Sequence, residues 1–488
     1  MEKIKVTQRR ELNLENGASS TTWLTYSLHL EGGAELSQKP REASTEFTAG
    51  DTLFAAWKTK RQEEGHISLC YRFSAWMKFQ KNGRGDIAMK PRILTAALSA
   101  LAAIFASGWC GANAKDAAKA PPLSSIPTFP TENIGREGHF YVGGHYEGEP
   151  GKEIMFGAMY VEVMVPKKIQ HPYPIVFICG GAGQTAVTVL QTPDGRPGWA
   201  YDFLNQGYTV YVMDYPGRGR SLFFPNSDAD GKLSAPRTSS LMEEVWSGGR
   251  PPSTPQSTWP QYTKQTQWPG DGPNKGKMGD PIFDAFAKTE IPVVLGGNVE
   301  KYTTDALIQL LDMIGQPVIL LMHSGVSTSG WELADARPKL IKGIVAAEPV
   351  APPIENAERG QTGPGRLWGL TNLPVHYDPP IKDASELQTM RQEKADGPDR
   401  IPCWVQKEPV RKLVNLQGIP VLDVSGEASY HRPYAHCIAK WLNQAGVKTT
   451  FVNLEDVGLR GNGHQMMSEK NSAGIAKYLQ SWIEKNVR

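Results

Sequence analysis

Apolar runs alternate with segments of helical periodicity along most of the chain after residue 135. Strand-like runs occupy residues 139–142, 158–165, 174–179, 208–214, 317–322, 343–347, 419–425 and 449–454. Helical patterns lie between the later runs, at 301–314, 434–444 and 472–484. Several runs are continuously apolar, which is typical of strands buried on both sides. The alternation predicts an α/β fold, with a mostly parallel sheet and helices on both of its faces.

Two long stretches interrupt this alternation. Residues 222–300 and 350–415 are rich in Pro, Gly, Ser and Trp. Loops of this length inside a compact domain are usually lids or binding loops. Both stretches follow the carboxyl ends of predicted strands, where open α/β sheets bind their ligands. We therefore expect them to form a cap over the ligand site, with aromatic residues such as Trp259 and Trp268 in it.

The first part of the chain has a different character. Residues 1–88 are polar without a clear period, and no fold is predicted for them. Residues 89–114 combine a basic start, an apolar run and an Ala-x-Ala ending, which is the pattern of a secretory signal peptide. Because signal peptides are N-terminal, the pattern predicts that translation starts at Met89 and that residues 1–88 are an upstream extension. The mature chain would begin near Lys115.

An uncleaved signal anchor is the alternative, but the apolar run is short for a membrane span. Cleavage predicts a periplasmic or secreted protein with no stable membrane association afterwards. Residues 115–134 have the composition of a linker. They would connect the signal segment to a folded domain at 135–488.

Charge and cysteine content narrow the classes of partner. The formal net charge is +2 and no Lys/Arg-rich run stands out, so nothing suggests a nucleic-acid partner. The five cysteines show no metal-ligand spacing, and we predict neither a metal nor an organic cofactor. Cys403 and Cys437 could pair in an oxidising compartment, although the sequence does not give their geometry.

A serine follows the strongest apolar run. Residues 317–322 predict a buried strand that ends abruptly at Ser324, and helical composition resumes at Trp331. Strand, serine and helix in this order are the context of a nucleophile elbow. An elbow usually has small residues two positions either side of the serine, but Ser324 has Met322 and Val326 there. Ser327, between Gly325 and Ser329, fits that spacing better, but it would already lie in the first turn of the helix. We prefer Ser324 as the nucleophile because it comes directly after the strand.

Candidate partners for this serine follow other strands. His464 lies in a glycine-containing loop between the last predicted strand and the last predicted helix, where it could act as a general base. Glu348 ends the run 343–347 and Glu427 follows the next run. Either carboxylate gives the order serine, acid, histidine that is expected of an α/β hydrolase.

A glycine-rich segment follows the early run 174–179, where hydrolases have the loop that binds the oxyanion. Its sequence is Cys179-Gly-Gly-Ala-Gly183. Glycine lets a backbone N–H group approach the developing negative charge. A phosphate-binding loop is the rival interpretation, but the lysine of that motif is absent.

Five motifs together resemble a family of secreted bacterial α/β-hydrolase esterases, which includes the sulfonylurea-herbicide de-esterifying enzyme. They are residues 192–199, 215–221, 334–338, 343–349 and 458–464. The resemblance spans roughly residues 135–486 and implies an α/β-hydrolase domain over 135–488 with cap insertions.

The resemblance also implies roles for individual residues. Ser324 matches the nucleophile of the family, Glu348 the acid and His464 the base. The oxyanion donors carry over to Gly181 and Gly325. Two departures are evident: Gly-Val-Ser follows Ser324 in place of the usual x-Ser-Gly, and Cys179 stands where the family has a histidine.

These observations predict a serine carboxylester hydrolase that acts on a small-molecule ester through an acyl-enzyme intermediate. A lactonase or a carbon–carbon bond hydrolase could use the same triad. A catalytically inactive, hydrolase-shaped binding protein is the alternative from another class. A homodimer is possible, and the sequence does not give the acyl or alcohol specificity.

Overall fold

The computed structural model describes residues 127–221, 232–253, 259–296, 298–358 and 363–488, together with four strands closer to the N-terminus. The chain divides into two units, Met1–Lys119 and Ala120–Arg488. The signal segment 89–114 lies outside the described residues, as does most of the linker 115–134.

The first unit contains an antiparallel sheet in the order β1-β2-β4-β3. Its strands are β1 (Ile4–Glu11), β2 (Trp23–Glu31), β3 (Gln62–Glu63) and β4 (His66–Ala75). These strands lie within residues 1–88, for which no fold was predicted from the sequence. The register pairs Tyr26 with Phe73 and Leu28 with Tyr71. Residues 24–31 of β2 alternate between apolar and polar, a local period of two that favours strand pairing and that the search for a period over residues 1–88 overlooked.

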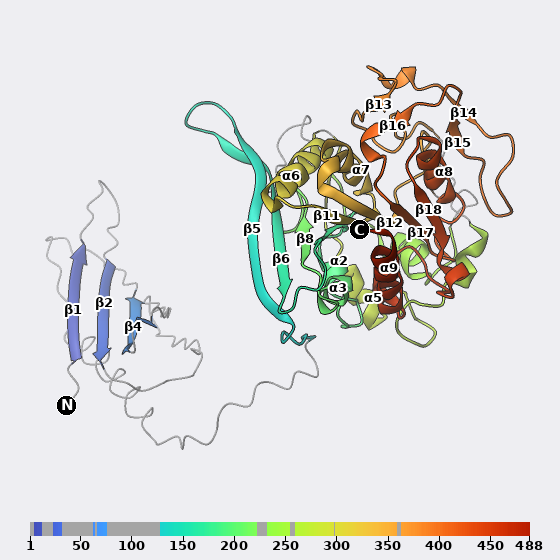
Figure 1. Ribbon diagram of the computed structural model, residues 1–488. Helices are drawn as coiled ribbons and strands as arrows, with labels where there is room; N and C mark the ends of the chain where they lie inside the picture. The colour runs from blue at the N-terminus through green and yellow to red at the C-terminus, as the bar shows by residue number, and fades with distance from the viewer. Residues whose placement is uncertain are drawn as a thin grey trace, which may run out of the picture. The chain divides into compact units, whose positions relative to one another are not determined.

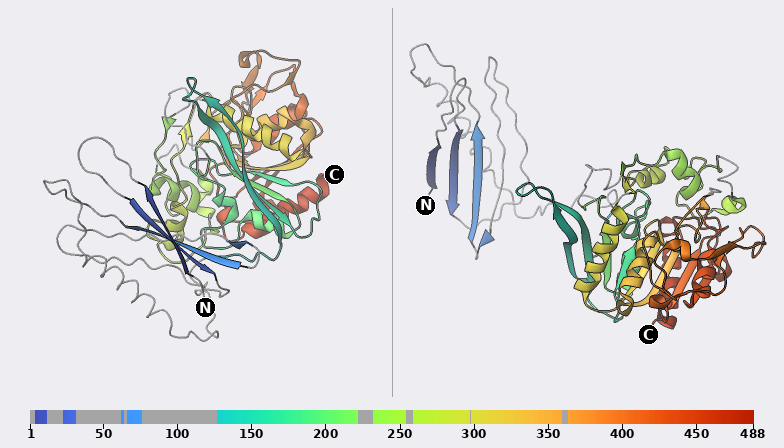
Figure 2. Two further views of the ribbon diagram at one scale, coloured as in Figure 1. Left: turned by 90° about the vertical axis from the view of Figure 1, so that its left-hand side faces the viewer. Right: turned by 90° about the horizontal axis from the view of Figure 1, so that it is seen from above.

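The second unit is built on an eight-stranded sheet in the order β18-β17-β12-β11-β7-β8-β6-β5 (Figure 1). Its strands are β5 (Ile134–Glu147), β6 (Ile154–Pro166), β7 (Ile175–Ile178), β8 (Val210–Asp214), β11 (Val318–Ser324), β12 (Ile341–Pro349), β17 (Val421–Ser425) and β18 (Thr449–Asn453). Six strands of this sheet are parallel, namely β8, β7, β11, β12, β17 and β18. The remaining strand pairs are antiparallel, since β6 runs antiparallel to both β5 and β8. The hairpin of β5 and β6 projects beyond the rest of the sheet (Figure 2).

Helices cover both faces of this sheet (Figure 1). They are α2 (Val187–Leu190), α3 (Trp199–Asn205), α6 (Val299–Ile314), α7 (Ser327–Ala336), α8 (His436–Gln444) and α9 (Ser472–Asn486). In β7, Val176 and Ile178 pack in the core under α6, α7 and α8. The alternate residues Ile175 and Phe177 pack in the core under α3 and α9. A strand buried on both faces needs apolar residues at every position, and the α/β fold predicted from such runs is confirmed.

The two long insertions carry short elements of their own. The first contains β9 (Lys232–Leu233), α4 (Ser239–Met242), η2 (Glu243–Ser247), η4 (Pro260–Lys264), α5 (Pro281–Ala287) and β10 (Val294–Leu295). The second contains β13 (Tyr377–Asp378), η7 (Ala384–Glu386), β14 (Thr389–Arg391), β15 (Trp404–Gln406), β16 (Lys412–Leu413) and η8 (Val414–Leu416). Aromatic side chains give the first insertion a small core of its own. This core includes Trp246, Trp259, Trp268, Phe283 and Phe286.

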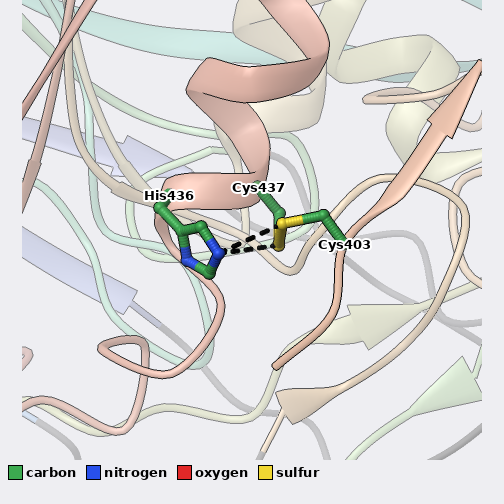
Figure 3. A group of neighbouring side chains, drawn as sticks. All are labelled: Cys403, His436 and Cys437. Atoms are coloured by element: carbon green, nitrogen blue, oxygen red, sulfur yellow. Dashed lines mark hydrogen bonds between the residues drawn. A yellow bond between two sulfur atoms is a disulfide. The ribbon is translucent and has the colours of Figure 1, made fainter. Parts of the chain in front are cut away.

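A disulfide joins the second insertion to the sheet's helical layer. Cys403, next to β15, is bonded to Cys437 in α8, with 5.3 Å between their Cα atoms (Figure 3). The Nε2 atom of His436 lies 3.2 Å from the sulfur of Cys403. Because the two sulfurs are bonded to each other, they offer no thiolate to a metal ion.

Among the described residues, no helix combines the length and apolar character needed to cross a bilayer.

Candidate active site

Ser324 lies at the sharp turn between β11 and α7. Its backbone φ is +58°, in the left-handed region that non-glycine residues rarely adopt. A strained turn of this kind directs the side chain of an elbow serine away from the sheet. The Oγ atom lies 3.0 Å from Nε2 of His464, within hydrogen-bonding distance.

The bulky residue before the elbow is accommodated by a glycine in the following helix. Met322 is fully buried, and its sulfur would lie only 2.1 Å from a Cβ atom at Gly330. Elbows usually have a small residue two positions before the serine. Here that position is Met322, and the small residue is Gly330 of α7, which packs against it. The departure from the usual pattern therefore leaves the turn intact.

Ser327, the alternative nucleophile, is the first residue of α7 and is fully buried. Its Oγ atom accepts a hydrogen bond from the backbone N–H of Val350 at 2.9 Å. This contact ties the start of α7 to the chain just after β12. The described contacts of Ser327 are therefore structural, and it is Ser324 that meets the histidine.

His464 is held between the serine and a carboxylate. Its Nδ1 atom lies 2.6 Å from Oε2 of Glu348, and the imidazole is 1% exposed. Its loop is fixed by the buried Glu469, which accepts hydrogen bonds from the N–H of Gly463 at 2.8 Å and from the side chain of Asn462 at 2.6 Å. With its loop fixed, the imidazole of His464 has Nδ1 toward Glu348 and Nε2 toward Ser324.

Glu348 is completely buried at the end of β12. Its Oε1 accepts a hydrogen bond from the N–H of Gly426 at 2.7 Å, and its Oε2 accepts one from the Ser429 hydroxyl at 2.6 Å. Glu427, the alternative acid, instead accepts from the N–H of Gly461 at 3.0 Å. Glu348 lies at the end of β12 and Glu427 just after the neighbouring β17, but only Glu348 contacts the histidine.

Burial shifts the pKa values of both His464 and Glu348. Burial lowers the pKa of His464, and the positive charge of Arg237 lowers it further. Burial raises the pKa of Glu348, against the hydrogen bonds from Ser429 and Gly426 that lower it. The imidazole is therefore neutral at neutral pH. With Nδ1–H donating to the carboxylate, Nε2 is the acceptor that points to the serine hydroxyl.

The glycine-rich loop after β7 lies against the elbow. A Cβ atom at Gly181 would lie 2.9 Å from the backbone nitrogen of Gly325, so only glycine allows this approach. Two arginines bind the carbonyl groups of the loop: Arg218 donates to the Gly180 oxygen at 2.7 Å, and Arg237 donates to the Ala182 oxygen. Within the described part of the chain, the N–H groups of Gly181 and Gly325 donate no hydrogen bond to another protein group. They lie beside Ser324 as two free donors.

Comparison with known proteins places the chain in a family. It is 43% identical over 366 residues to the "Probable secreted lipase phiG" of Fungal sp. (strain ATCC 74256), covering 74% of this chain and 94% of the lipase. The chain belongs to the family of this lipase, the α/β-hydrolase esterases and lipases. No family model matches the sequence.

Solved structures of other esterases are similar to this hydrolase. A novel bacterial esterase has a TM-score of 0.49 and 22% identity, covering 74% of this chain and 99% of its own. A fungal esterase from Rhizomucor miehei has a TM-score of 0.33 and 14% identity, covering 82% of this chain and 97% of its own.

The first insertion of this hydrolase lies close to His464. The Nε1 atom of Trp259 donates to the Ala428 carbonyl at 2.8 Å, and its ring lies 5.8 Å from that of Tyr430. The ring of Tyr430 in turn lies 4.9 Å from that of His464. Ala182 of the glycine-rich loop packs against the same aromatic core. The insertion therefore borders both the histidine and the glycine-rich loop.

Sequence reasoning did not single out two further histidines of the site. The ring of His431 is parallel to that of His464 within 10°, with 4.4 Å between centroids. The ring centroid of His323 lies 4.5 Å from that of His464, and its Nε2 atom is 3.0 Å from the His464 carbonyl oxygen. A usable signal was their position, since both are at or just after the carboxyl end of a strand.

Potential metal ligands come together here as well. Glu348, His431 and His464 each have a ligand atom within 4.8 Å of the others. However, both nitrogens of His464 already face hydrogen-bonding partners, Glu348 and Ser324. The arrangement thus suits proton transfer to and from the serine.

Proposed function

We propose that this hydrolase cleaves carboxylic esters through an acyl-enzyme, with Ser324 as nucleophile, His464 as base and Glu348 as acid. One observation carries the proposal: a continuous series of contacts runs from the buried carboxylate through both ring nitrogens to the hydroxyl of a strained elbow serine.

The chemistry follows from the positions of the donors and acceptors. Nε2 of His464 takes the proton of Ser324 as Oγ attacks the ester carbonyl carbon. Glu348 stabilises the imidazolium that forms. The N–H groups of Gly181 and Gly325 bind the oxyanion.

The imidazolium then donates its proton to the leaving alcohol as the carbon–oxygen bond breaks. In the second half of the reaction, His464 deprotonates a water molecule that attacks the acyl-enzyme carbonyl. The carboxylic acid leaves and the serine regains its proton. Every step balances without a metal or a redox partner.

The two long insertions are placed where they could select the substrate. We propose that residues 222–300 and 350–415 form a cap, because the first of them borders both His464 and the glycine-rich loop through Trp259 and Ala182. Aromatic side chains in a cap would contact the acyl or alcohol group of the ester.

We also propose that the enzyme is exported. The signal pattern at 89–114 and the similarity to a lipase named as secreted support this proposal. N-terminal sequencing of the exported chain should find its start near Lys115. A chain that begins at Met1 would contradict cleavage at this site.

Turnover of a series of p-nitrophenyl acyl esters tests the function. The wild-type chain should hydrolyse the series with an initial burst of nitrophenol, the kinetic sign of an acyl-enzyme. The Ser324→Ala variant should be inactive, whereas the matched control Ser327→Ala should retain most of the activity. A wild-type chain without ester turnover would refute the proposal.

A further inference from the structure

His431 is a buried histidine that the proposed mechanism does not use. It lies in the loop after β17 and is 1% exposed. Its ring is stacked on the ring of His464 at 4.4 Å, nearly parallel at 10°. Two flat rings at this distance and angle contact each other over their faces, and not through a hydrogen bond between ring nitrogens.

His431 is itself held in place by further contacts. Its ring lies 5.0 Å from that of Tyr434 and 4.5 Å from that of Tyr430. Its backbone N–H donates to the Ser429 hydroxyl at 3.1 Å, and the same hydroxyl donates to Glu348. The ring therefore has little freedom to turn away from His464.

The charge state of His431 is set by its surroundings. Burial lowers its pKa well below the ordinary value, and the neighbouring His464 and His323 lower it further. The charged and titratable groups around the stacked pair are Glu348 from β12, His323 from β11, Arg237 from the first insertion, Arg366 from the second, and Tyr430 and Tyr434 from the loop after β17. His431 is thus a neutral aromatic ring at neutral pH.

We propose that His431 is a positioning residue whose neutral ring stabilises the imidazolium form of His464 by stacking on it. The proposal rests on the proposed function, because it concerns the base of that mechanism. A cation within about 6 Å of an aromatic ring is attracted to the electrons of its face. Both rings are buried, and in a buried site of low dielectric this attraction is stronger than in solvent.

The stacking would act on the transition state more than on the bound substrate. The imidazole of His464 is neutral before the reaction and becomes positively charged when it takes the serine proton. The attraction to the ring of His431 therefore grows as the reaction proceeds, and an interaction of this kind raises kcat without changing KM. It also raises the pKa of His464 relative to a site without the ring.

Two substitutions separate this role from simple packing. His431→Phe keeps an aromatic face that cannot titrate, whereas His431→Leu fills a similar space without a face. We expect His431→Leu to lower kcat about tenfold, with KM within about twofold of wild type. The acid limb of its kcat/KM profile should move about one unit to lower pH, because the imidazolium is less stable. His431→Phe should keep both quantities within about threefold of wild type.

Rates are counted per active site, by titrating each variant with an organophosphonate that labels the serine. If the Leu variant does not fold, His431→Met provides the same comparison, because its flexible side chain adapts to irregular space.

Equal losses of kcat in the Phe and Leu variants would overturn the proposal in favour of packing. An acid limb that moves to higher pH in the Leu variant would show that His431 repels the imidazolium, and would overturn it as well. Failure of the proposed function is distinguishable, since the wild-type chain would then show no ester turnover at all.

Discussion

Replacing Glu348 by glutamine tests how the carboxylate acts on the histidine. The carboxylate accepts hydrogen bonds at both oxygens, from Gly426 N–H at Oε1 and from Ser429 and His464 at Oε2. A glutamine has one oxygen and one NH₂ group, so one of these positions must receive a donor. The outcome depends on which partner can change from donor to acceptor.

The backbone N–H of Gly426, 2.7 Å from Oε1, cannot become an acceptor. An NH₂ group there could donate to the Ser425 hydroxyl, 3.4 Å from Oε1, but it would leave the buried N–H of Gly426 without an acceptor, at about 1–3 kcal/mol. At the Oε2 position, the Ser429 hydroxyl can rotate and His464 can move its proton. The amide therefore takes the second orientation, and Nδ1 of His464 becomes an acceptor.

That orientation disables the base. With Nδ1 unprotonated, the proton of the neutral ring sits on Nε2, which faces Ser324 and can no longer accept the serine proton. A triad with the wrong tautomer loses about 10⁴ in kcat, and we expect a loss of this order for Glu348→Gln. KM should change little, because the substitution does not touch the substrate.

The matched control is Glu427→Gln on the neighbouring strand, whose carboxylate binds the Gly461 N–H and the exposed Arg460. It should keep kcat within about threefold, as measured by initial rates on a p-nitrophenyl ester. A loss under tenfold in Glu348→Gln, or an equal loss in Glu427→Gln, would refute the reasoning.

Three further predictions concern pH and the first insertion. Because burial and Arg237 lower the pKa of His464, kcat/KM should fall only below pH 6.5, as a pH–rate profile would reveal; an acid limb above that value would contradict the assignment. Burial and the nearby Glu300 raise the pKa of Glu332 to about 9. Between about pH 5 and pH 9 the folded state keeps a proton on Glu332 that the unfolded state has lost. As the pH rises through this range, the free energy of unfolding therefore falls by up to about 1.4 kcal/mol per pH unit. Glu332→Gln should therefore flatten the pH dependence of urea unfolding over that range, and an unchanged slope would exclude this role. Trp259→Ala should raise KM for bulky esters more than for acetate esters, whereas equal increases would mean that the ring only packs the insertion.

The sheet and the elbow could be predicted because the strand signals were local. Continuous apolar runs such as 317–322 marked strands buried on both faces, and the abrupt change at Ser324 marked the turn. The contact of Met322 with Gly330 could not be predicted, because it depends on how α7 folds back over β11. For that reason the bulky residue counted against Ser324 in the sequence, although the structure accommodates it.

The choice between the two acids shows the same limit. Glu348, at the end of β12, and Glu427, just after β17, lie at the same edge of the sheet, so position alone does not separate them. Their hydrogen-bond partners do, and these come from residues far along the chain, such as His464 and Gly461. His431 was overlooked for a similar reason: its role depends on a ring contact across 33 residues of sequence.

The central claim is that Ser324 is the nucleophile, and covalent labelling tests it most directly. An organophosphonate inhibitor reacts with the activated serine of a hydrolase, and mass spectrometry of the digested protein locates the adduct. We predict one adduct, on Ser324, that disappears together with turnover in Ser324→Ala and persists in Ser327→Ala. An adduct on Ser327, or full labelling of the Ser324→Ala variant, would contradict the account.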